Sequence, residues 1–148
     1  MNMYRYVFFF ALSIMLSYSL CFSQDYSEKL LIKYESSEID QMKSQNAWDL
    51  ELLSFFVEEG YYFIDMPDKE IDYIELQRVD PKSGSIISGY SISEKDIEDF
   101  NPLNFNCMFD EYKNRYYKVG NTGKLLVVQP AHVLANKIDN KKRIQRNQ

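Results

Sequence analysis

Four consecutive apolar residues, Leu125 to Val128, constrain the fold of this chain more than any other stretch. An apolar residue at every position is typical of a strand that is covered on both faces of a sheet. The tyrosine-rich segment just before it, residues 115–119, predicts a second strand. Gly120 and Gly123 lie between the two segments, so together they predict a β-hairpin.

The sequence between these two strands, "GNTGK", invites comparison with a phosphate-binding loop. Such a loop has four residues between its glycines and a serine or threonine directly after its lysine. Here two residues separate Gly120 from Gly123, and Leu125 follows Lys124. We therefore predict a turn whose glycines tolerate positive φ, and we expect no nucleotide and no other cofactor.

Successive side chains of a strand point to opposite faces of the sheet. In the strand at residues 115–119, Tyr116 and Lys118 share one face, and Arg115, Tyr117 and Val119 share the other. Because Val119 is apolar, we expect its face to point inward. Tyrosine is common at protein contacts, since it combines an apolar ring with a polar tip. Tyr116 and Lys118 are therefore the predicted partner-binding residues.

Aromatic doublets recur elsewhere, as "FF" at residues 55–56 and "YY" at residues 61–62. In a strand, each doublet places one ring on the core side and one ring on the other side. The second ring is either exposed for contact with a partner or part of a second core layer under the helices. The sequence leaves both interpretations open.

Two capping signals predict helical structure before residue 60. In such a signal a side-chain oxygen accepts a free backbone N–H, and a carboxylate three residues later reaches back. This spacing occurs at Ser37 with Asp40 and at Asn46 with Asp49. The pattern predicts one long helix, or two helices with a break near Asn46. Gly60 stands where a C-cap glycine belongs.

The other elements follow from β-branched runs, turn residues and caps. Ser93 with Asp96 predicts a short helix, and Pro130 can open a final one. The turn "DPKSG" predicts a hairpin. Strands are predicted at residues 30–34, 61–67, 71–79 and 85–92. The chain is therefore expected to be α+β, a single domain with a mostly antiparallel sheet and helices packed on one face. The domain is predicted at residues 24–136, followed by a frayed basic tail at residues 137–148.

Residues 1–23 are predicted to be a signal peptide. Arg5 precedes an apolar run, and Cys21 with Ser23 fits the small-residue positions of a cleavage site, which would leave Gln24 first. An uncleaved anchor is the second interpretation, although a spanning helix needs about 20 apolar residues. Lipid attachment at Cys21 is the third. We expect an exported protein that is periplasmic or associated with the outer membrane.

Few side chains suit metal binding or catalysis. His132 is the only histidine, and Cys107 is the only cysteine after residue 23. A zinc site needs three or four protein ligands, and the acidic stretches 68–72 and 94–99 lack the spacing of a calcium loop. We expect no metal and no catalysis. A small envelope hydrolase using Cys107, with His132 as base, or a carboxylate pair is one alternative. A carrier of an apolar ligand is another.

The chain has a net charge of −5, and five of its basic side chains lie after residue 136. The body before that point is therefore acidic. Proteins that bind nucleic acid replace phosphate counterions with basic groups. The charge distribution argues against a nucleic-acid partner and favours a protein partner.

The segment ending "CFSQ", the aromatic-rich body and the hairpin "YYKVGNTGKLLVV" resemble small exported proteins that accompany type IX secretion and gliding machineries. The resemblance covers the signal and one hairpin and includes no catalytic motif. It implies an accessory role in the periplasm or at the outer membrane and assigns no functional residues. The sequence thus predicts an exported, non-catalytic binding or adaptor protein with a protein partner in the cell envelope.

Overall fold

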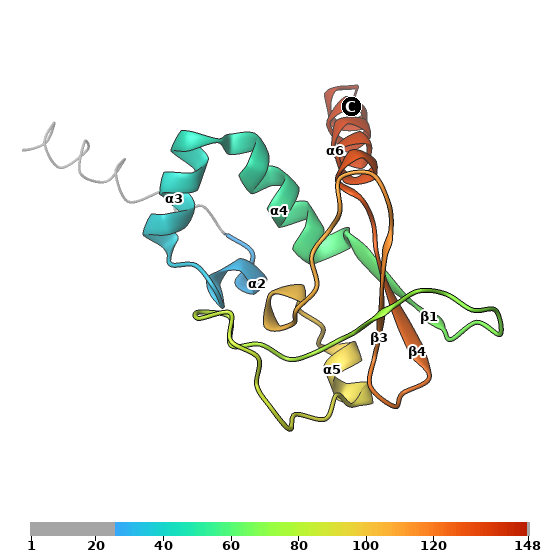
Figure 1. Cartoon of the computed structure of the whole chain (residues 1–148). Helices are drawn as coiled ribbons and strands as arrows, with labels where there is room; N and C mark the ends of the chain where they lie inside the picture. The colour runs from blue at the N-terminus through green and yellow to red at the C-terminus, as the bar shows by residue number, and fades with distance from the viewer. Residues whose placement is uncertain (1–25, 148) are drawn as a thin grey trace, which may run out of the picture.

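The structure is a computed structural model that describes residues 26–147. The predicted signal peptide, Cys21 and the predicted cleavage site therefore lie outside the described residues. The helices are α2 (Glu28–Leu31), α3 (Ser36–Gln45), α4 (Ala47–Glu59), α5 (Glu94–Glu98), the 3₁₀ helix η1 (Pro102–Asn104) and α6 (Ala131–Arg146). The strands are β1 (Tyr61–Asp65), β2 (Ile74–Glu75), β3 (Arg115–Lys118) and β4 (Lys124–Val128) (Figure 1). No helix within residues 26–147 combines the length and apolar character needed to span a membrane.

The four strands form one sheet in the order β1-β4-β3-β2. The interior strand β4 pairs antiparallel with both β1 and β3, while β2 pairs parallel with β3. The helices α2, α3 and α4 lie on one side of this sheet (Figure 1). The predicted α+β domain with a mostly antiparallel sheet is therefore confirmed.

Strand β4 is buried on both of its faces, as the apolar run predicted. Leu125, Leu126, Val127 and Val128 are each at most 1 % exposed. Because side chains alternate along a strand, Leu126 and Val128 point into the main core beside the helices, and Leu125 and Val127 point to the opposite face. Each of the latter two lies between neighbours from β1 and β3 on that face.

The main core lies between the sheet and the helices and is rich in aromatic rings. Phe100 is central to it, with its ring centroid 4.9 Å from that of Tyr61, 5.2 Å from Phe63 and 4.8 Å from Phe105. The first two contacts are edge-to-face, and the last is stacked. These are the arrangements that aromatic quadrupoles favour, and they fix the loop before η1 against β1.

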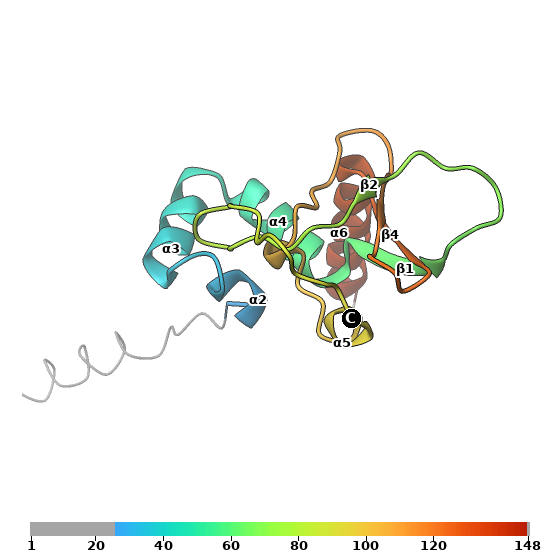
Figure 2. The ribbon, with the colours of Figure 1, turned by 60° about the horizontal axis from the view of Figure 1, so that its bottom comes forward.

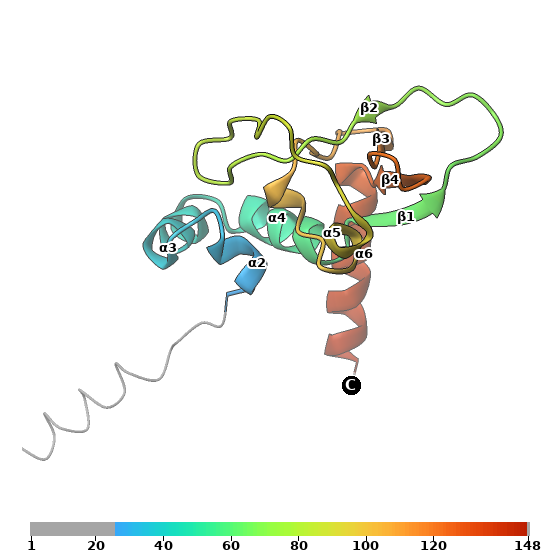
Figure 3. The ribbon, with the colours of Figure 1, turned by 90° about the horizontal axis from the view of Figure 1, so that it is seen from below.

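Residues 66–73 join β1 to β2, which lie at opposite edges of the sheet. They leave β1 beside the β3–β4 turn, where the Met66 N–H donates to the Gly123 carbonyl at 2.8 Å. The segment then swings out in a wide loop (Figure 2). It lies on the side of the sheet opposite α3 and α4 (Figure 3). This face, opposite the helices, is called the outer face below.

The beginning of the chain differs from the prediction in two places. Residues 30–34 were predicted to be a strand, and this is wrong, because Ser27 caps the short helix α2 and Leu30 is buried. The cap of α3 is not Ser37 with Asp40. Instead, Glu35 and Glu38 form a reciprocal capping box, in which the Glu38 carboxylate accepts the Glu35 N–H at 2.7 Å.

The break near Asn46 is confirmed, since α3 and α4 are separate helices. The Asn46 side chain accepts the Asp49 N–H at 3.3 Å and so caps α4. Gly60 follows α4 as its C-cap, as predicted, with a φ of −81°. Gly60 therefore does not have the positive φ that is common at C-cap glycines.

The strands predicted at residues 71–79 and 85–92 are reduced to β2 and isolated bridges. Only Ile74–Glu75 forms a strand, and Val79 pairs with Ile86 through a single bridge. The turn "DPKSG" between them is confirmed, with Gly84 at a φ of 72°. The segment after β1 must cross to the opposite edge of the sheet, and only Ile74 and Glu75 pair there with β3. Helix α5 begins as predicted, with Ser93 and Asp96 as its capping box.

Helix α6 continues through the segment that was predicted to fray. It ends at Arg146, so the predicted boundary at residue 136 falls inside a helix. Ile138 is buried, Lys141 pairs with Glu59 at 3.0 Å, and Lys142 pairs with Glu51 at 2.6 Å. The basic side chains of this segment therefore pair with acidic side chains of α4. Composition alone did not reveal this tertiary contact.

Candidate functional site

The predicted partner-binding residues lie on β3, where alternation decides their direction. Tyr117 and Val119 are each 1 % exposed and face the core, whereas Tyr116 and Lys118 are half-buried on the outer face. The predicted orientation of the strand is therefore confirmed. The role of Tyr116 and Lys118 in partner binding stays a prediction.

Strand register places Tyr116 in a row of tyrosines that crosses the outer face. Tyr62 on β1 and Tyr116 on β3 both pair with Val127, so they flank it. Tyr73 directly precedes Ile74, which pairs with Tyr117, so Tyr73 lies beside Tyr116. Tyr62 and Tyr73 are each 45 % exposed, although Val127 between the strands is buried. We call Tyr62, Tyr73, Tyr116 and Lys118 the outer tyrosine surface.

Lys118 fixes one end of this surface. Its ammonium lies 3.3 Å from the Glu75 carboxylate and 5.6 Å from the centre of the Tyr73 ring. The ion pair joins β3 to β2, and the cation–π contact orients Tyr73. An exposed pair of this kind contributes little stability, on the order of 0–1 kcal/mol. Lys118 therefore serves mainly to position its neighbours.

Two open grooves adjoin the outer tyrosine surface. One, of about 580 Å³, is lined by residues 71–74 and by Tyr116 with the segment before it. The other, of about 630 Å³, lies between residues 66–73 and Lys118. The two grooves share residues 71–73, so the surface continues along the loop that joins β1 to β2.

The "GNTGK" stretch is a hairpin turn, as predicted. Gly120 and Gly123 have φ values of 50° and 71°, and the Val119 N–H donates to the Lys124 carbonyl at 3.1 Å. The Lys124 ammonium lies 2.6 Å from the Asp65 carboxylate. The hydrogen bond from Lys124 lowers the pKa of Asp65. The lysine is thus engaged by a carboxylate on the neighbouring strand.

Cys107 and His132 lie in different environments and each has a backbone carbonyl as its hydrogen-bond partner. Burial raises the pKa of the Cys107 thiol to about 12, and the thiol contacts the Pro102 carbonyl at 3.5 Å. His132 lies on the surface, where its Nδ1 is 3.2 Å from the Glu111 carbonyl oxygen. A nucleophilic cysteine needs a lowered pKa and access to solvent, so this environment argues against that role.

Several carboxylates bond cations or backbone N–H groups. Among residues 26–147, no group of three or more histidine, cysteine or carboxylate side chains converges as a metal site would. Asp110, for example, accepts the Tyr112 and Lys113 N–H groups and pairs with Arg115 at 3.3 Å. These bonds lower its pKa.

One polar cluster was missed by the sequence analysis. Arg78 Nη1 donates to Asp96 at 3.0 Å and to the Tyr90 hydroxyl at 2.9 Å, and Tyr90 donates to Asp96 at 2.6 Å. Burial alone would raise the pKa of Asp96, but hydrogen bonds from Tyr90 and Ser93 and the charge of Arg78 outweigh it, so the pKa is lowered. The cluster fastens α5 to the segment around the "DPKSG" turn, which gives it a structural role.

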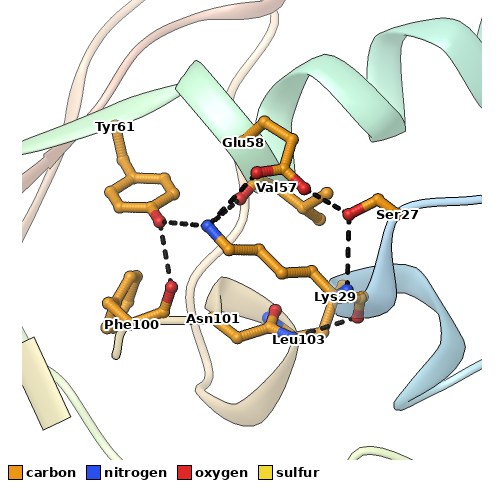
Figure 4. Close-up of polar contacts among 8 residues, drawn as sticks. All are labelled: Ser27, Lys29, Val57, Glu58, Tyr61, Phe100, Asn101 and Leu103. Atoms are coloured by element: carbon orange, nitrogen blue, oxygen red, sulfur yellow. Dashed lines mark hydrogen bonds and ion pairs between the residues drawn. The ribbon is translucent and has the colours of Figure 1, made fainter. Parts of the chain in front are cut away.

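A second cluster surrounds Lys29 and joins segments far apart in the sequence (Figure 4). The Lys29 ammonium donates to the Val57 carbonyl at 3.0 Å and to the Tyr61 hydroxyl at 3.1 Å, and it pairs with Glu58 at 3.5 Å. The Tyr61 hydroxyl in turn donates to the Phe100 carbonyl at 3.0 Å. Lysine and tyrosine side chains serve in many catalytic sites, but here both are committed to backbone carbonyls.

Asn101 completes the Lys29 cluster. It is 4 % exposed, donates to the Lys29 carbonyl at 3.0 Å and accepts the Leu103 N–H at 3.0 Å. A buried amide with both ends satisfied specifies one arrangement of the chain around it. The cluster therefore locks α2 to the end of α4 and to β1.

Comparison with known proteins gives no relative of this chain: no family model matches it, and neither a curated protein nor a solved structure is significantly similar to it. The resemblance to type IX secretion and gliding accessories therefore stays a prediction from the sequence.

Proposed function

We propose that this protein is an exported, non-catalytic adaptor of the cell envelope, and that the outer tyrosine surface binds its protein partner. The observation that carries the proposal is the row Tyr62, Tyr116 and Tyr73 across one face of the sheet. Between residues 26 and 147, none of their hydroxyl groups has a hydrogen-bond partner, whereas Tyr61 and Tyr117 on the inner face each bond backbone.

The chemistry of tyrosine supports this use of the surface. A ring that is 45 % exposed in the free chain offers apolar area for burial, and its hydroxyl is ready to bond a partner. Tyrosine is enriched among the residues that dominate binding energy at interfaces. The grooves beside the row add concave surface for partner side chains.

The two other functions that the sequence left open receive less support. A carrier of an apolar ligand needs an enclosed apolar cavity, whereas the grooves described above open to solvent. A cysteine hydrolase needs a reactive thiolate, whereas Cys107 is buried with a raised pKa. An exposed, tyrosine-rich face is the feature that an adaptor needs, and Tyr62 and Tyr73 are exposed on the outer face.

The envelope location rests on the sequence of residues 1–23 and on the resemblance to exported accessory proteins. Export with cleavage after Ser23 gives a mature chain that begins at Gln24. The intact mass of protein recovered from the envelope fraction measures this directly. A chain that begins at Met1 would indicate an anchor instead, and a lipid on Cys21 would indicate a lipoprotein.

The binding surface is tested by a pull-down from membranes with tagged protein. The double variant Tyr116→Ala with Lys118→Ala is expected to recover at least about fivefold less partner, with a thermal melt close to that of the wild type. Tyr112→Ala is the matched control, because Tyr112 is 72 % exposed but lies off the sheet. Recovery that is unaltered in the double variant, or equally reduced in the control, would remove the outer tyrosine surface from consideration.

A further inference from the structure

The free edge of β1 is a second surface of the sheet with unused bonding capacity. Hydrogen bonds from the Gln129 N–H to the Gly60 carbonyl (2.9 Å) and from the Met66 N–H to the Gly123 carbonyl (2.8 Å) bracket its ladder with β4. Because antiparallel bonding alternates, Tyr61, Phe63 and Asp65 direct their N–H and C=O groups away from β4. Within the described part of the chain, these groups have no backbone partner.

A groove runs beside this edge. It has a volume of about 520 Å³ and is lined by Lys29, by residues 61–63 of β1 and by residues 97–100 at the end of α5. Five strand residues span about 17 Å, so the edge is long enough to bind a peptide of similar length. The groove lies on the inner-face side of β1, because the Phe63 ring packs against Phe100.

Strand β1 lacks the features that usually protect an edge. Proteins blunt such edges with charged side chains, lysine above all, with proline or with a bulge. The sequence of β1, "YYFID", has no lysine and no proline, its one charged side chain is Asp65 at its end, and its ladder with β4 is regular from Tyr61 to Asp65. An unprotected edge of this kind is the template for strand addition, in which an extended peptide joins the sheet.

The charge around the edge selects the kind of peptide. Glu98 and Asp99 line the groove, and no ion pair within residues 26–147 neutralises either one. Of the nearby cations, Lys29 pairs with Glu58 and Lys124 pairs with Asp65. Lys95 of α5 lines a different groove, beside Arg78 and Tyr90. A second copy of this chain would bring the same acidic groups against one another, whereas a basic peptide complements them.

We propose that β1 accepts an extended basic peptide segment as a fifth, antiparallel strand of the sheet. Residues directly opposite in an antiparallel pair share one face. Peptide residues opposite Tyr61, Phe63 and Asp65 therefore point toward the groove, where basic side chains meet Glu98 and Asp99. The alternate peptide residues point to the outer face beside Tyr62, where apolar side chains fit. The recognised sequence alternates basic and apolar residues.

This inference goes beyond the proposed function, because it uses the edge of the sheet and backbone bonds, and of the outer tyrosine surface only Tyr62 borders this edge. The probe is a capped, fluorescently labelled peptide of seven residues that alternates lysine and valine. Its binding to the purified full chain is measured by fluorescence anisotropy. We expect saturable binding that weakens as salt rises, and at least tenfold weaker binding when glutamate replaces lysine.

Backbone methylation of the peptide tests strand addition itself. In the proposed register the lysine N–H groups bond β1, and the valine N–H groups point to the open side. N-methylation of the two central lysines is expected to weaken binding at least tenfold, whereas N-methylation of two valines changes it less than about threefold. Equal effects of the two modifications, or no effect of either, would overturn the proposal.

Protein variants provide the complementary test. Asp65→Pro removes an outward N–H without breaking a bond to β4, a position where edge strands tolerate proline. Asp65→Ala is the matched control, because it loses the same ion pair with Lys124 and keeps the N–H. We expect the proline variant to bind the peptide at least fivefold more weakly than the alanine variant. If Asp65→Pro does not fold, the methylated peptides on the wild-type chain decide the question.

Two further experiments test the need for the Glu98 and Asp99 charges and the possibility that a second copy of the chain occupies the edge. Glu98→Gln with Asp99→Asn is expected to weaken binding at least threefold and to flatten its salt dependence. Tyr116→Ala with Lys118→Ala is expected to leave peptide affinity unchanged, so failure of the proposed function does not affect this result. A concentration-dependent dimer that Asp65→Pro abolishes and the peptide does not displace would assign the edge to a second copy and overturn the proposal.

Discussion

The two faces of the sheet are built from the same kinds of residue but differ in burial. On the inner face, Tyr117 is buried and its hydroxyl bonds the backbone of Met108 at 3.2 Å. On the outer face, the adjacent Tyr116 is half-buried beside open grooves. The doublet at Tyr61 and Tyr62 divides in the same way. Strand alternation, rather than residue type, therefore decides which tyrosine packs in the core and which is more exposed, on the outer face.

The largest difference is expected between the two tyrosines of the β3 doublet. Tyr117→Ala removes a ring from a packed core and leaves a cavity, so it should lower the free energy of unfolding by about 3–5 kcal/mol. Tyr116→Ala removes a half-buried ring and should cost less than about 1 kcal/mol. Denaturant unfolding of both variants measures this. Equal losses would show that the outer face is a second layer of core, and the comparison would fail.

The turn that aligns β3 with β4 should give the next largest effect, because it sets which side chains face inward. Gly123 has a φ of 71°, and a Cβ atom placed there meets no atom within 4 Å, so the expected cost of Gly123→Val is backbone strain. We expect a loss of about 1–2 kcal/mol. Asn121→Val, in the same turn, is the control, since within the described residues positive φ occurs only at glycines. A control that destabilises as much as Gly123→Val would contradict the turn argument.

Ion pairs on the two sides of the molecule should respond differently to pH. The pKa of Asp96 is lowered in the folded chain, so its contribution is present above its ordinary pKa near 4 and is lost as pH falls through the folded pKa. Asp96→Asn should therefore cost about 1 kcal/mol at pH 7, and the difference from wild type should shrink as pH drops from about 5 to 2. Glu75→Gln, at the exposed pair with Lys118, should change stability by less than about 0.5 kcal/mol at pH 7. A pH-independent cost for Asp96→Asn would refute this assignment.

The smallest effect is expected at Lys124. Its pair with Asp65 is exposed, so Lys124→Ala should change stability by less than about 0.5 kcal/mol. ATP with Mg²⁺ should shift the melting point of neither the wild type nor this variant. Nucleotide that stabilises the wild type but not Lys124→Ala would instead show that the turn grips phosphate.

The parts of the fold that the sequence predicted well depend on local information. The apolar run of β4, the glycines of the turn and the alternation along β3 each act within a few residues, and all three predictions hold. The capping pairs at Asn46 and Ser93 are local in the same sense. Local patterns therefore sufficed to place Tyr116 and Lys118 on the outer face.

The parts that the sequence missed depend on contacts between distant segments. Residues 30–34 have the composition of a strand, but burial of Leu30 and the bonds of Lys29 hold the start of this segment in α2. Tyr73 reaches the tyrosine row only because β2 pairs parallel with β3. No spacing in the sequence indicates that β2 and β3 pair. The sequence therefore could not predict that Tyr62, Tyr116 and Tyr73 lie in one row.

The position of β4 in the chain has a consequence for how the protein is made. One of the two central strands of the sheet, β4, is also the last in the chain, and Tyr61 at the start of β1 pairs with Val128 at the end of β4. Contacts between such distant residues slow folding. During synthesis both edges of the aromatic strand β1 therefore stay unpaired until residues 124–128 have been made. Unpaired edges of this kind are prone to aggregation. The four-stranded sheet can assemble only once β4 is present, so a chain that stops before Lys124 has the helices from α2 to η1 but lacks the strand that joins β1 to β3.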